Sequence, residues 1–236
     1  MEYITKKEID FKNPIVIEGF PSVGLVGSIA AHQIIKNLKL EYIGYFDTPE
    51  VPPINLVEEG VVYPSIRVYG KEDLIVLFSD VIIPPIVVHS LSDKIVETLI
   101  SINPQVVISL GGLATGKSEK VYGIASSKDL LEIFEKYEIP ILKFGMVGGV
   151  SGSLMVKSNN NKIPAIGLLA ETVGIRPDPR GASNLINVLN RIYNLNVDVE
   201  ELIEEADKID EKIKQLAQEH AKLMTKTARS EYPMYL

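Results

Sequence analysis

The hydrophobic positions of this chain alternate between short continuous runs and longer stretches with helical spacing. The runs are rich in Val, Ile and Leu and predict strands at 13–19, 41–48, 61–70, 74–80, 104–112, 140–149 and 162–172. The helical stretches lie at 22–39, where Ser22 is the expected N-cap, and at 89–103, 126–139 and 180–194. This alternation predicts one α/β domain at 1–196, with a mostly parallel sheet covered by helices on both faces. The runs 61–70 and 74–80 are expected to form a hairpin around Gly70 and Lys71.

A helix with a different pattern is predicted after this domain, from 198 to about 226. Its apolar positions are spaced alternately by 4 and 3, which is a heptad repeat, and they are Leu202, Ala206, Ile209, Ile213, Leu216, His220 and Leu223. Such a narrow seam favours packing against another helix, whereas packing on the chain's own domain normally uses a wider stripe. We therefore predict a long coiled-coil-like helical extension at 197–228. The predicted oligomer contacts are Leu202, Ile209, Ile213, Leu216 and Leu223.

Composition narrows the classes of function. The chain of 236 residues has 24 Lys and Arg against 31 Asp and Glu, a net charge of −7, whereas nucleic-acid binders normally present a basic face. The absence of cysteine excludes disulfides and thiolate chemistry and favours a reducing, cytoplasmic location. The three histidines lack metal-ligand spacing, and neither a signal peptide nor a membrane-spanning run is recognisable. We expect no nucleic acid, membrane, metal or cofactor.

The segment "GGLATGKS" at 111–118 matches the phosphate-binding-loop pattern G-x-x-x-x-G-K-[ST] and follows a predicted strand. Such a loop requires a helix that opens at its Lys and Ser, so that backbone N–H groups face the phosphates. The continuation "EKVYGIASS" is typical of a strand instead, and the acid-ending run "LIVLFSD" with Asp80 lies upstream rather than downstream. We therefore expect no NTPase. The residues that could still bind an anion or small ligand are Gly111, Gly112, Gly116 and Lys117.

Three further loops contain residue types that could carry chemistry. The glycines of "GFPSVGLVG" at 19–27 lack the dinucleotide-binding order and favour close helix packing. The segment "GGVSGS" at 148–153 misses G-x-S-x-G by one residue, and any catalytic triad would need a histidine from a predicted helix: His32, His89 or His220. The loop "ETVGIRPDPRGA" at 171–182 groups Glu, Asp and two Arg, either for a ligand or, as we favour, in surface ion pairs. We predict no catalytic residues.

Four of these segments together indicate a family. The stretches "IEGFPSVGLVGSIAAHQII", "GGLATG", "GGVSGSL" and "GLLAETVG…PDPRGA" resemble the proteasome assembly chaperone family in its archaeal, ATP-independent form, and the resemblance covers the whole chain. It implies a phosphorylase-like three-layer α/β/α fold, a non-enzymatic role and a homo-oligomer, with a tetramer favoured. The implied partner is the α-ring of the 20S proteasome core particle, and the implied role is its assembly, the opening of its gate, or both.

The chain end fits this resemblance. Residues 229–236 are expected to be a flexible docking tail, and "MYL" looks like the hydrophobic-Tyr-X tails that proteasome activators insert into α-ring pockets. Tyr235 offers a flat ring with a hydroxyl, Met234 an adaptable apolar side chain, and Leu236 a free carboxylate for a pocket lysine. Several tails in one oligomer would gain affinity through effective concentration. The alternative is a phosphorylase-like or nucleotide-binding enzyme that uses 111–118 and the loop 176–180.

Overall fold

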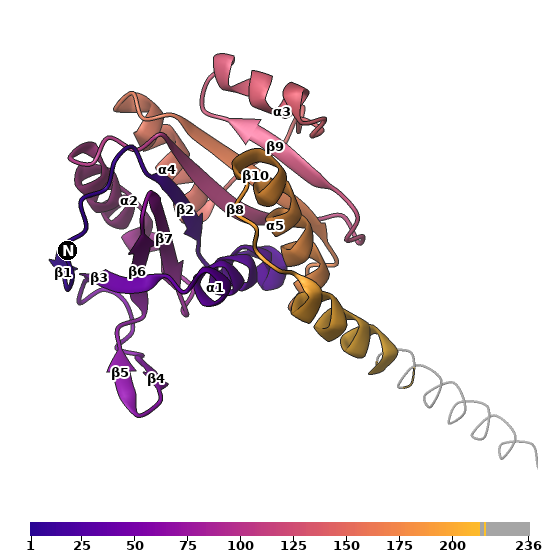
Figure 1. Cartoon of the computed structure of the whole chain (residues 1–236), viewed down its shortest axis with the longest axis horizontal. Coiled ribbons are helices and arrows are strands. Elements are labelled where there is room, and N and C mark those ends of the chain that lie inside the picture. The colour runs from indigo at the N-terminus through magenta and orange to yellow at the C-terminus, as the bar shows by residue number, and fades with distance from the viewer. Residues whose placement is uncertain (213–214, 216–236) are drawn as a thin grey trace, which may run out of the picture.

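The protein folds around a mixed eight-stranded sheet with helices on both faces (Figure 1). The computed structural model describes residues 1–212 and 215. Across the sheet the strands are β1 (Glu2–Thr5), β3 (Glu41–Asp47), β6 (Ile66–Lys71), β7 (Leu74–Ser79), β2 (Ile15–Gly19), β8 (Val106–Ala114), β10 (Ala165–Thr172) and β9 (Val121–Ala125). A separate hairpin joins β4 (Leu56–Glu58) to β5 (Val61–Tyr63).

The expectation of a mostly parallel sheet is wrong, because only the four central strands β7, β2, β8 and β10 are parallel neighbours. β1, β3, β6 and β9 all pair antiparallel with their neighbours. The predicted hairpin at 61–80 is confirmed for β6 and β7, which a tight turn at Glu72 and Asp73 connects. Such a turn can only join antiparallel strands, since a parallel pair needs a long crossover. The segment Val61–Tyr63, predicted to belong to this hairpin, pairs with β4 instead.

Helices cover both faces of the sheet, as the alternating pattern predicted. The helices are α1 (Val26–Leu38), which follows the 3-10 turn η1 (Val23–Leu25), then α2 (Pro85–Ile100), α3 (Glu132–Lys136) after η2 (Asp129–Leu131), α4 (Gly149–Asn160) and α5 (Pro179–Tyr193). α1 packs with α5 on one face, and α2 packs with α4 on the other. Because β2 is buried on both faces, Ile17 joins the core under α1 and α5, and Val16 joins the core under α2 and α4.

The sequence prediction failed at 140–149, which is not a strand. Only Ile141 forms a single bridge, with Gly123, and the following loop leaves Phe144 93% and Met146 98% exposed. α4 then begins at Gly149, although no helix was predicted there. Its glycine and serine content hid it, because these residues have poor intrinsic helix propensity and tertiary packing decides the outcome.

The start of α1 also differs from expectation. Ser22 makes no capping hydrogen bond, and its buried hydroxyl has no partner within the described residues. The chain forms η1 first, with Gly24 and Leu25 both at positive φ. The glycine there is required by space as well, because a Cβ on Gly24 would lie 2.4 Å from the Thr172 hydroxyl. η1 is thereby held against the ends of β8 and β10.

Candidate functional site

The C-terminal helix, residues 200–212 in the described part, leaves the domain beside α1 and α5 (Figure 1). Its first turns belong to the domain core, because Leu202 is 5% and Ala206 4% exposed. Gln33 donates a hydrogen bond of 2.9 Å to the Asp198 carbonyl, just before the helix. Lys36, one turn further along α1, lies 2.8 Å from the Glu201 carboxylate. The beginning of the helix is therefore fixed to α1 by apolar burial and by two polar contacts.

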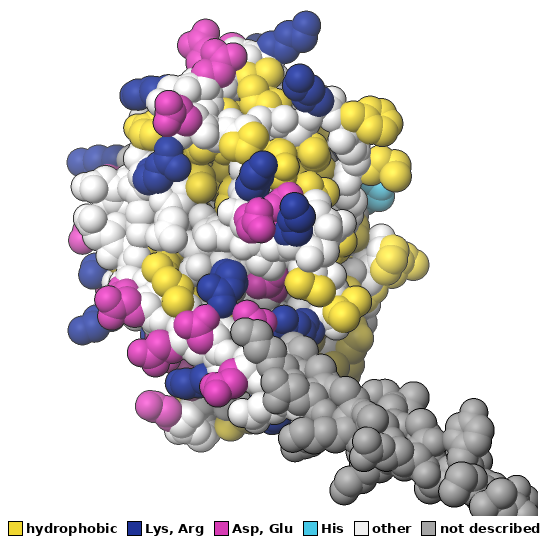
Figure 2. Space-filling view, turned by 90° about the vertical axis from the view of Figure 1, so that its right-hand side faces the viewer, with side chains coloured by type: hydrophobic (Ala, Val, Ile, Leu, Met, Phe, Trp, Pro, Cys, Tyr) yellow, Lys and Arg dark blue, Asp and Glu magenta, His cyan; other side chains and the backbone are white. Residues whose placement is uncertain are grey.

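Four charged residues hold the same helix two turns later, and we call them the ion-pair clamp: Arg176, Arg180, Asp207 and Asp210. Arg176, in the loop after β10, donates to Asp210 at 2.9 Å. Arg180, in the first turn of α5, donates to Asp207 at 2.7 Å and to Asp210 at 3.2 Å. Figure 2, which views the molecule from this side, shows acidic and basic side chains interspersed around the base of the helix.

The clamp perturbs the titration of its members. The hydrogen bond from Arg176, reinforced by Arg180, holds the pKa of the Asp210 carboxyl below its ordinary value. The hydrogen bond with Asp207 raises the pKa of the Arg180 guanidinium. These charges attract one another from two different parts of the chain, so the two arginines of the loop 171–182 serve in surface ion pairs, as we favoured from the sequence. Their partner, the C-terminal helix, was not foreseen. The acids of this loop, Glu171 and Asp178, are buried and accept hydrogen bonds from backbone N–H groups instead.

The packing of the C-terminal helix against its own domain corrects one predicted oligomer contact. Leu202 was expected on a seam between subunits, but it lies in the core cluster of its own chain and offers little exposed surface to a second copy. The physical reason is that the first turn of the C-terminal helix packs against α1, whose apolar residues offer a wider surface than a narrow helix-helix seam. Ile209 is half-buried. Ile213, Leu216 and Leu223 lie outside the described residues.

The glycine-containing loops meet one another at the carboxyl edge of the parallel strands. Gly112 lies inside β8, and a Cβ there would come within 2.1 Å of the Val23 carbonyl oxygen of η1. Asp178 caps α5 by accepting from the Gly181 N–H at 2.9 Å, and it also accepts from the Ser118 hydroxyl. The loops therefore bind each other and fill an edge where many α/β proteins bind ligands.

The candidate phosphate loop lacks the geometry of one. Gly111 belongs to β8, residues 115–120 are irregular, and β9 begins at Val121, so no helix opens at Lys117. Lys117 and Gly116 are exposed. Asp80, considered as an acidic partner of such a loop, is 2.6 Å from Arg67, whose side chain is 2% exposed. Asp80 thus neutralises a buried guanidinium.

The serine-containing first turn of α4 contacts a buried acid, and it has no hydrogen bond to a histidine within residues 1–212. The Ser151 hydroxyl donates to Glu18 at 2.8 Å, and Glu18, at the end of β2, also accepts from the Phe20 N–H at 3.0 Å. Burial raises the pKa of this carboxyl, although the hydrogen bonds from Ser151 and Phe20 act in the opposite direction. The contact ties α4 to the centre of the sheet.

The remaining candidate residues are scattered or outside the described chain. His32 lies on α1 beside the ring of Phe78, with a centroid separation of 6.0 Å, and His89 is exposed on α2. His220 and the predicted tail residues Met234, Tyr235 and Leu236 lie outside the described residues. Within residues 1–212 and 215, no group of three potential metal ligands occurs. No helix in that same part of the chain is both long and apolar enough to cross a membrane.

Comparison with known proteins identifies the family. Residues 16–217 match the model of the PAC2 family, and the chain belongs to this family. It is 52% identical to the uncharacterized protein MJ0106 of Methanocaldococcus jannaschii over 236 residues, covering 100% of this chain and 98% of the relative. A crystal structure of PbaA from Pyrococcus furiosus, described as an archaeal homolog of proteasome-assembly chaperone, is 38% identical with a TM-score of 0.84 and 97% coverage of both chains. The same organism's PbaB, described as an archaeal proteasome activator, shares the fold at 22% identity, a TM-score of 0.82, and coverage of 92% of this chain and 98% of its own.

Proposed function

We propose that this protein binds the α-ring of the 20S proteasome core particle through Met234, Tyr235 and Leu236 and acts in assembly or activation of that particle without catalysis. The observation that carries the proposal is the 38% identity to PbaA across 97% of both chains, in a chain that itself ends on Met-Tyr-Leu. The likeness to PbaB, at 22% identity, supports the fold on which such a function would rest. A cytoplasmic location follows from the proposal, since the partner resides there.

The mounting of the C-terminal helix supports this function. A docking tail is useful only if the domain presents it in a defined direction, because each ordered rotamer and loop costs binding free energy. Here Leu202 is buried in the core, and the ion-pair clamp holds the helix again two turns later. The domain thus fixes the direction of the helix as far as residue 212.

In the pocket, three groups of the chain end would act together. The Tyr235 ring would bury apolar area and donate its hydroxyl, the Met234 side chain would fill a neighbouring apolar space, and the Leu236 carboxylate would pair with a lysine. One tail of this size binds weakly, so we include a homo-oligomer in the proposal, with a tetramer favoured. Ile209 and Ile213 are its proposed contacts, and several tails would bind one ring at once.

The second candidate is a nucleotide- or phosphate-dependent enzyme built on 111–118. Two observations weigh against this enzyme. No helix begins at Lys117, and the Ser118 hydroxyl donates its hydrogen bond to the Asp178 carboxylate. Backbone N–H groups at a helix N-terminus are what make such a loop bind phosphate. We therefore favour the binding function over the enzyme.

The proposal is tested by capture of an archaeal 20S core particle on immobilised protein. Capture by the intact chain, and its loss when the last three residues are removed, is the expected result. Lys117→Ala serves as the matched control, and capture by this variant should equal that of the intact chain. Equal capture by the truncated chain would remove the tail from the account, and capture by neither chain would remove the core particle as the partner.

A further inference from the structure

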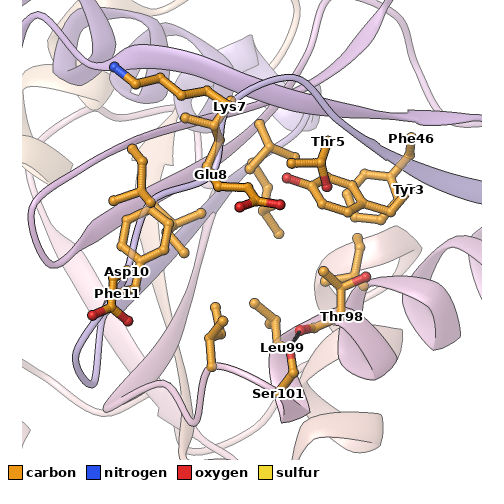
Figure 3. A pocket seen from close by; sticks show the side chains of 17 residues that line it. Tyr3, Thr5, Lys7, Glu8, Asp10, Phe11, Phe46, Thr98, Leu99 and Ser101 are labelled. Atoms are coloured by element: carbon orange, nitrogen blue, oxygen red, sulfur yellow. Dashed lines mark hydrogen bonds between the residues drawn. The ribbon is translucent and has the colours of Figure 1, made fainter.

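A cavity of about 710 Å³ lies on the α2 side of the sheet, far from the C-terminal helix. Its floor is formed by β3, β6 and β7, one wall by the end of α2, and the opposite wall by β1 and the segment 7–11 that follows it (Figure 3). The floor and the α2 wall are apolar and buried, with Ile43, Phe46, Ile75, Leu77, Ile95 and Leu99 each below a tenth exposed. This volume falls within the range of small-molecule sites, about 300–1,000 Å³.

Aromatic rings surround the space on the β1 side. Tyr3 and Phe46 stand 5.1 Å apart between ring centroids with their planes tilted by 44°, and Phe11 lines the other end. Burial raises the pKa of the Tyr3 phenol, so its hydroxyl stays neutral and available as a donor or acceptor. Aromatic faces carry negative electrostatic potential and attract cations within about 6 Å.

The charged residues of the cavity lining are Lys7, Glu8 and Asp10. Figure 3 shows the Glu8 carboxylate directed into the space beside Tyr3 and Thr5, whereas the Lys7 side chain points away from it. The Lys7 ammonium is paired with Glu41. Asp10 adds a second carboxylate to the lining. Neither Glu8 nor Asp10 forms an ion pair with any residue in the described part of the chain.

We propose that this cavity binds an organic cation, an amine carried on an apolar body, with the ammonium group against the Glu8 carboxylate and the body on the apolar floor. An anionic ligand would meet the Glu8 carboxylate and the negative faces of the rings. A neutral apolar ligand would shield Glu8 from water and leave its charge without a partner, which costs free energy. An ammonium group satisfies the carboxylate and the aromatic rings together, and Figure 3 shows the hydroxyls of Tyr3 and Thr5 on the same side of the space as the Glu8 carboxylate.

Three probes that share a phenylalkyl group and differ in charge separate the contribution of the ammonium group to affinity from that of the apolar group. They are phenylbutylamine, phenylbutanol and phenylbutyrate. Each is titrated into isotopically labelled full-length protein and followed through the amide signals of 5–11 and of the end of α2. We expect the amine to shift these signals with a dissociation constant at least about 10-fold below those of the alcohol and the carboxylate, a difference of about 1.4 kcal/mol. Equal or tighter binding of phenylbutyrate would overturn the proposal, and so would the absence of amine binding up to about 10 mM.

Variants then test the residues. Glu8→Gln should reduce the affinity for the amine to that for the alcohol, while Glu2→Gln, the same charge change at an exposed position of β1 outside the cavity lining, should leave it unchanged. Thr98→Phe should fill the space from α2 and abolish binding of all three probes, with retained signal dispersion showing that the variant is folded. Unchanged amine affinity in Glu8→Gln would contradict the proposal even if Thr98→Phe failed to fold. The test uses no core particle, so it stands independently of the proposed function.

Discussion

Removing the Asp210 carboxylate should loosen the C-terminal helix without unfolding the domain. Asp210→Ala deletes the contacts to Arg176 at 2.9 Å and to Arg180 at 3.2 Å, and the three side chains are between 31% and 43% exposed. Ion pairs this exposed contribute about 0.2–1 kcal/mol each. Two of them therefore stabilise the docked helix by about 1 kcal/mol, which is a factor of about 5 in its opening equilibrium. Truncating the buried Leu202 would cost more, about 2–5 kcal/mol.

Hydrogen exchange read by mass spectrometry measures this opening. Peptides covering 200–212 should exchange about 5-fold faster in Asp210→Ala, whereas peptides from β8 should not change. The control is Glu204→Ala, because within residues 1–212 Glu204 pairs only with Lys208 of the same helix, at 3.7 Å. High salt should speed exchange of the unaltered helix toward the variant's rate, since exposed pairs are screened. Unchanged exchange in Asp210→Ala, or an equal effect of Glu204→Ala, would refute the clamp.

Acidification should loosen the helix in the same way. The pKa of Asp210 is lowered in the folded protein, so its contribution is complete above the ordinary carboxyl pKa and is lost as the pH falls through the lowered value. Exchange of 200–212 in the unaltered chain should therefore accelerate at acidic pH beyond the intrinsic pH effect, and that excess should be smaller in Asp210→Ala. An equal excess in both proteins would assign it to another group.

Three further predictions concern the domain. In urea titrations, the gain in unfolding free energy of Glu18→Gln over the unaltered protein should be larger at neutral pH than at about pH 4.5. The reason is that the pKa of Glu18 is raised in the folded protein, so the unaltered protein loses stability as the pH rises through that raised value. A difference between the two proteins that does not depend on pH would refute this. Gly112→Ala should lower stability by about 1–3 kcal/mol, because its Cβ would lie 2.1 Å from the Val23 carbonyl oxygen, and an unchanged melting temperature would show that η1 yields easily. Calorimetry with ATP should detect no specific site, and a micromolar site lost in Lys117→Ala would restore the nucleotide-binding alternative.

The predictable parts of the fold are the strands that are each formed by one continuous apolar stretch of the sequence. β2, β8 and β10 are continuous apolar runs because both of their faces are covered, and this pattern is visible without any partner. β1 was missed, since four residues with a charge at one end carry no clear period. Strand order was beyond reach, because β9 follows β8 in the chain but pairs with β10, and such long-range pairing leaves no local signal.

The residues of the ion-pair clamp could be recognised in the sequence, but their pairing could not. The arginines of 171–182 and the acids of the terminal helix were each evident, but 34 residues separate Arg176 from Asp210, and only the fold brings them together. The heptad spacing correctly indicated Leu202 and Ala206 as buried positions, yet it could not say which partner covers each one, and Leu202 is covered by its own domain. The cavity beside Tyr3 had no sequence signal, because its lining comes from four strands, a helix and a loop.

The affinity of the core particle for the chain with one residue added after Leu236 tests the central claim most directly. The addition moves both the terminal carboxylate and Tyr235 by one position relative to the chain end, while the domain and its helix mounting stay as they are. We predict a loss comparable to that of Tyr235→Ala, about 2 kcal/mol or more per tail, with oligomer size unchanged by light scattering. Across several tails, capture of the core particle should disappear. Binding of the extended chain with the affinity of the natural end would contradict the account.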